Sequence, residues 1–258
     1  MNNRRVALVT AGAAGIGRAI AQRLAHAGIA VHICDVDGAA IADCLADNPG
    51  MSASRSDVAC VEQVDELFDD LLQHHGRLDI LVNNAGISGP TATVENIEPA
   101  DWDRTIAVDL SSAFYVTRKA VPLLRTSAGC IVNIASNASL FGLPLRSPYS
   151  AAKWALIGLT KTWAMELGPS GVRVNAICPG SVQGARIDGV IERDAALRGM
   201  PVESIREVYL RQSSLRVFVE AEEVAAMVEF LCSEGGRNIS GQSIAIDGHT
   251  ENLSNWLD

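Results

Sequence analysis

The sequence is poor in aromatic side chains and in positive charge. Only 5% of its 258 residues are aromatic, and 30 acidic residues against 21 basic ones give a formal net charge of -9. Nucleic acids and anionic membrane surfaces bind patches of Lys and Arg. The acidic balance therefore argues against both as partners. It does not restrict a small-molecule substrate, whose site depends on local charge.

Long hydrophobic runs and paired cysteines are also missing. The first apolar segment breaks into glycines at once, unlike a signal peptide, and no run approaches the roughly 18 apolar residues of a membrane span. The six cysteines are scattered singly, with no Cys-x-x-Cys pair. We therefore expect a cytoplasmic protein with reduced, mostly buried thiols and no metal site.

Short apolar runs alternate with amphipathic segments along the chain. The runs are almost continuously apolar, as in strands that are covered on both faces. They are Val6–Val9, Ala30–Cys34, Leu78–Val82, Ile131–Ile134, Val172–Ile177 and Ser243–Ile246. Residues 61–72 and 224–231 have helical spacing instead. The alternation predicts an α/β protein of Rossmann type, with a parallel sheet and helices on both faces, and one domain over residues 1–258.

Residues 184–218 follow a predicted strand without containing one. They hold six arginines and five acids. In open α/β sheets, long excursions after the carboxyl end of a strand tend to cover the ligand crevice. We expect this segment to be a substrate lid; two solvated surface helices are the alternative.

The first predicted strand leads into a glycine-rich turn and then a helix. Glycines let the backbone approach a pyrophosphate closely, and the helix N-terminus points free N–H groups at the phosphates. The residues expected to bind a dinucleotide here are Gly12, Gly15, Ile16 and Gly17. The second strand ends at Asp35, where a carboxylate accepts hydrogen bonds from a ribose and repels a 2′-phosphate. NAD is therefore predicted over NADP.

Tyr149 and Lys153 are four residues apart in a predicted helix, so they project from one face. A phenol titrates near pH 10, and a nearby ammonium favours its ionised form. Such a tyrosine can take the proton of an alcohol as hydride leaves carbon, or return it in the reverse reaction. Ser136, after the preceding strand, is suited to hydrogen-bond the substrate oxygen.

Several motifs stand in the order and spacing of the short-chain dehydrogenase/reductases, which the chain resembles from Arg5 to Gly248. They are Thr10 to Gly17, Asn83 to Gly86, Ser136, Tyr149-x-x-x-Lys153 and Pro179-Gly180. The resemblance implies a seven-stranded doubly wound sheet, a homotetramer, and NAD or NADP as cofactor. It implies that Tyr149 is the acid/base, that Lys153 binds the nicotinamide ribose and lowers the pKa of the tyrosine, and that Ser136 fixes the substrate oxygen.

The resemblance also implies further cofactor contacts. Asp57 and Val58 resemble the pair that contacts adenine, and the backbone near Val182 would meet the carboxamide. The remaining contacts that it implies are Asn84, Ala85, Gly86, Pro179 and Gly180.

Three positions depart from the family pattern. Ala11 stands for the usual Gly, Gly184 for a common Thr, and Asp109 for the fourth catalytic residue, an Asn. An Asp can accept a hydrogen bond from water or from Lys153, but its charge opposes ionisation of Tyr149. We therefore include Asp109 among the catalytic residues and expect an alkaline activity optimum.

The substrate is less well defined. An Arg-rich lid with few large apolar residues disfavours a steroid or a long acyl chain, which leaves a small polar alcohol: a sugar, a polyol or a hydroxy acid. Expected contacts are Ser136, Asn137, Tyr149 and Arg186, whose guanidinium suits a carboxylate, sulfonate or hydroxyl. His249 is interpreted as a substrate contact or, preferably, a subunit contact. A preference for NAD favours oxidation.

Two alternatives and one assembly prediction remain. A 3-oxoacyl-thioester reductase of the same family would want NADPH and a basic docking patch for its acidic carrier, which Asp35 and the acidic balance disfavour. A catalytically idle NAD-binding regulatory subunit is disfavoured by the intact Ser136, Tyr149 and Lys153. The helix at 149–167 is apolar over more than one face. We expect this helix to be buried between the subunits of a homotetramer; a helix that faces only its own sheet is the alternative.

Overall fold

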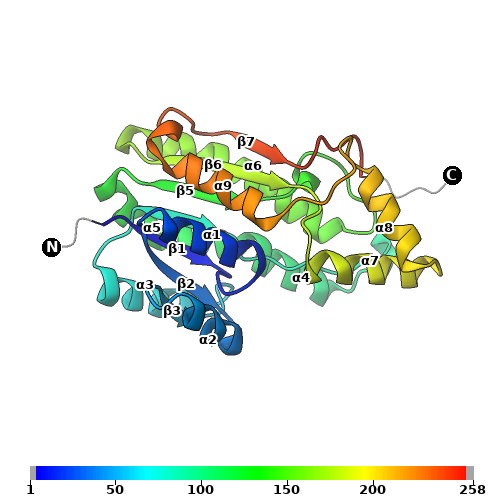
Figure 1. Cartoon of the computed structure of the whole chain (residues 1–258), viewed down its shortest axis with the longest axis horizontal. Coiled ribbons are helices and arrows are strands. Elements are labelled where there is room, and N and C mark those ends of the chain that lie inside the picture. Colours follow the sequence, from blue (N-terminus) through cyan, green and yellow to red (C-terminus); the bar gives the residue numbers. More distant parts are fainter. Residues whose placement is uncertain (1–3, 254–258) are drawn as a thin grey trace.

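The computed structural model describes residues 4–253 and contains one seven-stranded parallel sheet (Figure 1). Its strands are β1 (Val6–Thr10), β2 (Ala30–Asp35), β3 (Ser52–Arg55), β4 (Ile80–Asn83), β5 (Cys130–Ile134), β6 (Arg173–Pro179) and β7 (Ser243–Ile246). Their order is β3-β2-β1-β4-β5-β6-β7. The order reverses between β1 and β4, which is where α/β sheets bind ligands. The predicted doubly wound Rossmann-type sheet is confirmed.

Helices pack on both faces of the sheet (Figure 1). One face carries α1 (Gly15–His26), α2 (Gly38–Asp47) and α9 (Ala221–Cys232). The other carries α3 (Val61–His75), α5 (Ser112–Ser127) and α6 (Ser147–Leu167). Fully buried Leu8 and Val9 point to opposite faces from neighbouring positions of β1, which explains why this strand is continuously apolar. Within residues 4–253, no helix has the length and apolar character needed to cross a membrane.

The strand β3 has no apolar run, so hydrophobicity alone does not predict it. Its Ser52 and Ser54 hydroxyls are hydrogen-bonded to the Nδ1 and Nε2 atoms of His32 on β2, at 2.8 and 2.9 Å. His32 is fully buried. Hydrogen bonds between side chains of neighbouring strands thus replace apolar packing at this edge of the sheet.

The Arg-rich segment 184–218 forms α7 (Ala185–Arg198) and α8 (Val202–Arg211). The two helices lie beyond the carboxyl ends of the strands, at the right of Figure 1. They share a small apolar cluster of their own, with Ile191, Ala195 and Ile205 buried. The excursion after β6 is therefore helical, and it stands at the end of the sheet where the prediction put it.

Candidate active site

A cavity of about 490 Å³ opens at the carboxyl ends of the central strands. Most of the predicted site residues line it. They are Gly15, Ile16, Gly17, Asp35, Asn84, Gly86, Ser136, Asn137, Tyr149, Lys153, Pro179, Gly180, Val182 and Arg186. Five others do not: Gly12, Asp57, Val58, Ala85 and Asp109. The fold therefore joins the predicted cofactor end and the predicted reactive end in one chamber.

The glycine turn leads from β1 into α1 with its backbone exposed to the cavity. The N-cap residue Ala14 makes no side-chain hydrogen bond to the helix, so no side chain covers the first N–H groups. A Cβ on Gly17 would lie 2.0 Å from the carbonyl oxygen of Ala11, so only glycine fits there. Gly12 also has a packing role, because a Cβ at this position would lie only 2.7 Å from Ile33 Cγ2 of β2. It packs the turn against the sheet, and its predicted contact with a dinucleotide stays a prediction.

The carboxylate of Asp35 stands at the end of β2 on the rim of the cavity. Its Oδ2 accepts a hydrogen bond from the Ala13 N–H at 3.3 Å, and its Oδ1 accepts one from the Asp37 N–H at 3.2 Å. Within the part of the chain that the structure describes, no salt bridge neutralises it. The loop backbone therefore holds a half-buried negative charge at this end of the cavity.

Asp57 and Val58 follow β3, outside the cavity wall. The Asp57 carboxylate accepts a hydrogen bond from the Ala59 N–H at 3.0 Å and lies 3.4 Å from the guanidinium of Arg104. These contacts leave its predicted approach to adenine as an expectation.

The turn after β4 is tied to the glycine turn. The amide of Asn84 donates hydrogen bonds to the carbonyl oxygens of Thr10 and Ala11, at 2.9 and 3.0 Å. In return, Thr10 Oγ1 accepts the backbone N–H groups of Asn84 and Ala85, both at 2.9 Å. Asn84 and Ala85 thus fix the two turns to each other where the strand order reverses.

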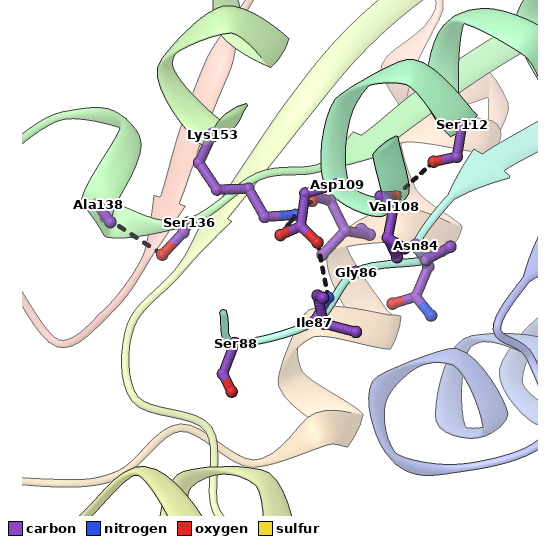
Figure 2. Close-up of polar contacts among 12 residues, drawn as sticks. Asn84, Gly86, Ile87, Ser88, Val108, Asp109, Ser112, Ser136, Ala138 and Lys153 are labelled. Atoms are coloured by element: carbon purple, nitrogen blue, oxygen red, sulfur yellow. Dashed lines mark hydrogen bonds and ion pairs between the residues drawn. The ribbon is translucent and has the colours of Figure 1, made fainter. Parts of the chain in front are cut away.

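Ser136, Tyr149 and Lys153 meet at the reactive end of the cavity. Ser136 precedes a short 3-10 turn, η3 (Asn137–Ser139). Its hydroxyl accepts the Ala138 N–H at 3.1 Å (Figure 2) and donates to Asn137 Oδ1 at 3.2 Å. Tyr149 and Lys153 lie one turn apart near the start of α6, and the Lys153 ammonium is 5.7 Å from the Tyr149 ring centre. The helical spacing thus brings them together as predicted.

Asp109 lies behind Lys153 rather than in the cavity wall (Figure 2). It sits in a π-helical turn, η2 (Ala107–Ser111), between α4 (Pro99–Ile106) and α5. Its Oδ1 accepts the Ile87 N–H at 2.7 Å, and its Oδ2 is 3.7 Å from the Lys153 Nζ. Lys153 also donates to the Ile134 carbonyl oxygen at 3.2 Å. Both charged groups are buried, so the pair is sheltered from solvent.

Arg146 is the main site residue that sequence reasoning missed. It is only 6% exposed, yet it lines the cavity, and its guanidinium carbon is 5.3 Å from the Tyr149 ring centre. Burial lowers the pKa of Arg146, while the nearby Tyr149 and Tyr209 raise it. Its position three residues before Tyr149 was an available signal, because such neighbours lie close on a helix face. Other lining residues that were missed are Ser88, Leu143, Gln183, Tyr209, Gln212 and Leu253.

Helix α7 places two more arginines beside the site. Arg186, a predicted substrate contact, has its guanidinium carbon 6.0 Å from the Tyr149 ring centre and donates to the Gly86 carbonyl oxygen at 3.2 Å. Arg193 donates to Ser88 Oγ at 2.9 Å. His249, by contrast, is exposed and hydrogen-bonded to Ser214 Oγ at 3.1 Å, outside the cavity.

A glycine turn at the reversal of a doubly wound sheet, facing a Tyr–Lys pair across one chamber, defines a Rossmann-fold oxidoreductase. Comparison with known proteins agrees: the family model described as enoyl-(acyl carrier protein) reductase matches residues 11–249. The chain belongs to the short-chain dehydrogenase/reductase family, whose members among its relatives act on CH–OH groups.

Relatives with different substrates resemble the chain equally well. A D-beta-hydroxybutyrate dehydrogenase of Cupriavidus necator is 36% identical over 96% of this chain and 98% of the relative. A 3-oxoacyl-[acyl-carrier-protein] reductase of Thermotoga maritima is 33% identical over 95% and 96%. The solved structure of an NAD+-bound xylitol dehydrogenase has a TM-score of 0.91 and 29% identity, covering 96% of this chain and all of that one.

Proposed function

We propose that the chain is an NAD-dependent dehydrogenase that interconverts a secondary alcohol and a ketone on a small polar substrate, mainly by oxidation. The observation that carries the proposal is the single cavity that Asp35, the glycine turn, Ser136, Tyr149 and Lys153 share. The hydroxybutyrate and xylitol dehydrogenases among the similar proteins support small polar substrates. Localisation in the cytoplasm is part of the proposal and rests on the scattered cysteines.

The residues at the cofactor end fit a dinucleotide with a free 2′-hydroxyl. Gly17 leaves room for close approach to the backbone, and the uncapped first turn of α1 offers N–H groups to a pyrophosphate. Asp35 supplies a carboxylate for ribose hydroxyls. Predicted backbone contacts at Gly15, Ile16, Gly86, Pro179, Gly180 and Val182 complete this set.

Different residues move the proton and orient the substrate oxygen. A bound nicotinamide would supply the hydride acceptor for the carbinol carbon. Tyr149 takes the hydroxyl proton, and Lys153 would hold the adjacent ribose and place a positive charge beside the phenol. The Ser136 hydroxyl turns from Asn137 to the substrate oxygen and orients it. Asp109 anchors Lys153 and the turn at Ile87 from behind.

The experiment that tests this function is a cofactor-reduction assay at 340 nm over sugars, polyols, hydroxy acids and acyl substrates. We expect turnover with NAD and a small polar alcohol, and loss of at least about 100-fold in kcat for Tyr149→Phe. A Tyr149→Phe variant with full turnover contradicts the assignment. NAD binding without turnover on any alcohol supports the idle regulatory subunit instead.

Cofactor choice has its own test. We expect kcat/KM to be at least about tenfold higher with NAD than with NADP, because Asp35 repels a 2′-phosphate. Asp35→Ala should lower the ratio of kcat/KM with NAD to kcat/KM with NADP. The matched control is Asp37→Ala, at the N-cap of α2, which should leave this ratio unchanged. Equal use of both cofactors by the wild type contradicts the proposal and favours the 3-oxoacyl-thioester reductase, represented by the Thermotoga relative.

The lid and the tetramer also belong to the proposal. Residues 184–218 cover the cavity from the carboxyl ends of the strands, and Ala185, Arg186, Ile187 and Val190 of α7 line it.

The outer face of α6 exposes Trp154 and Met165, at 51% and 81%. Large exposed apolar side chains on one helix favour its burial between subunits.

A further inference from the structure

The wall of the cavity next to Tyr149 gathers positive charge from two distant parts of the chain. Arg146 stands in the turn before α6, and Arg186 is on α7 of the lid. Their guanidinium carbons lie 5.3 and 6.0 Å from the same ring centre, and both residues line the cavity. Arg193 adds a third guanidinium close by, through its bond to Ser88.

These arginines do not neutralise protein carboxylates. Among the described residues, no Asp or Glu lies within salt-bridge distance of Arg146, Arg186 or Arg193, although many other arginines of the chain have such a partner. Arg146 donates to the Ser88 carbonyl oxygen, while its Nε is buried without a hydrogen-bond partner. A buried cation is costly unless an anion or hydrogen bonds compensate it.

We propose that Arg146 and Arg186 form a carboxylate clamp, so that the substrate is a short hydroxy acid and the product the corresponding keto acid. This inference rests on the proposed dehydrogenase function and selects one class among its small polar substrates. A guanidinium binds a carboxylate through two parallel N–H···O bonds, which fixes orientation as well as charge. The carboxylate supplies the acceptors that Arg146 lacks.

The place of the clamp also sets the size of the substrate. Both guanidinium groups lie within 6.0 Å of the Tyr149 ring centre, so the carboxylate and the reacting carbinol are close neighbours. The same cavity is lined by Asp35 and the glycine turn, so it has to hold the cofactor as well as the substrate, which favours a small substrate. A 2- or 3-hydroxy acid of a few carbons fits these conditions better than a polyol or an acyl thioester.

Ser88 links the clamp to the lid. Its carbonyl oxygen accepts from Arg146 and its hydroxyl accepts from Arg193 of α7. Arg186 also bonds to the turn after β4, at the Gly86 carbonyl oxygen. A carboxylate that binds both Arg146 and Arg186 therefore joins the start of α6 to the lid.

The test compares substrates that differ only in the carboxylate. Short 2- and 3-hydroxy acids are assayed with NAD against 2-butanol and small polyols. We expect the wild type to have a higher kcat/KM for a hydroxy acid than for the neutral alcohols. Arg146→Gln should lower kcat/KM for that acid by about 30-fold or more, mainly by raising KM. Arg186 is exposed, so Arg186→Gln carries little risk for folding; it should also lower kcat/KM for the acid more than for the neutral alcohols. The control is Arg237→Gln, an exposed position directly after η5 (Glu234–Gly236).

A binding measurement separates the clamp from the chemistry. Isobutyrate, a short carboxylate without a hydroxyl, should bind the enzyme–NADH complex in calorimetry, and binding should weaken by about 30-fold in either clamp variant. The clamp is overturned if the two variants lose kcat/KM equally for the acid and for the neutral alcohol, or if both bind isobutyrate as tightly as the wild type. Turnover of neutral alcohols without turnover of any acid also overturns it, while leaving the dehydrogenase function intact; no turnover at all refutes that function instead.

Discussion

At the scale of single residues, Asp109 adds a negative charge next to Lys153 that the family pattern lacks. The family pattern has a neutral Asn there, whereas this buried carboxylate lies 3.7 Å from Lys153. It therefore offsets part of the positive charge that Lys153 places beside Tyr149. The backbone hydrogen bond from Ile87 is one that an Asn oxygen can also accept.

We predict that Asp109→Asn shifts the activity optimum downward, because it removes a buried negative charge that lies 3.7 Å from Lys153 and close to the reactive end of the cavity. The measurement is the pH profile of kcat/KM with a saturating cofactor. Asp101→Asn, in the first turn of α4, is a control that leaves the profile in place. An unchanged optimum in Asp109→Asn would remove the argument.

Ala11 offers a second prediction at this scale. It has a φ of +47°, in the left-handed region that costs an alanine about 1–2 kcal/mol. Ala11→Gly relieves this strain but gives more freedom to the unfolded chain, so we expect a net gain of about 0.5 kcal/mol. Ala27→Gly, at a φ of -74° directly after α1, is the matched control and should not stabilise. Thermal unfolding by calorimetry compares them; a lower melting temperature for Ala11→Gly contradicts the prediction.

At the scale of elements, β2 and β3 are joined by a histidine that must stay neutral. Burial, with His74 and His75 nearby, lowers the pKa of His32 to about 4. The two serines of β3 occupy both ring nitrogens. Since the unfolded chain takes up this proton near pH 6.5 and the folded chain only near pH 4, stability falls as pH drops through this window.

We predict that His32 alone accounts for a loss of about 3 kcal/mol of stability between pH 6.5 and pH 4, at about 1.4 kcal/mol per pKa unit. Melting temperatures measured from pH 4 to pH 8 should fall more gently in His32→Gln than in the wild type. The control is His26→Gln, an exposed position at the end of α1. Identical slopes for His32→Gln and the wild type would contradict the prediction.

The same elements show how far sequence reasoning reaches. Five strands were predictable because their residues face apolar layers on both sides, whereas β7 packs only one face, through Ile244 and Ile246. Tyr149 met Lys153 because one helix carries both. β3 was invisible to hydrophobicity since side-chain hydrogen bonds hold it, and only the family resemblance supplied a seventh strand. The contact between Arg146 and Ser88 was not predictable, because it depends on the path of two loops, which no periodicity encodes. The packing role of Gly12 was missed because a glycine that packs against a strand and a glycine that contacts a ligand look the same in a sequence.

At the scale of the whole molecule, exposed apolar side chains on neighbouring helices favour self-association. Trp154 and Met165 project from α6, and Phe114 projects from the first turn of α5. We predict a homotetramer in light scattering. Met165→Glu combined with Trp154→Glu should lower the assembly state, because two charges would be buried without partners. Val94→Glu, on the exposed turn η1 (Val94–Asn96), is the control; a monomeric wild type contradicts the prediction.

The polar strand β3 has a consequence for how copies of the molecule avoid one another. As an edge strand, it exposes unpaired backbone groups that could template fibrils. Ser52 and Ser54 turn inward to His32, and Arg55 adds a charge at the rim, so the edge offers no sticky apolar stripe. Replacing the two serines with valine would leave both ring nitrogens of the buried His32 without partners, so β3 would be held less firmly and its unpaired backbone groups would become available to other copies of the chain.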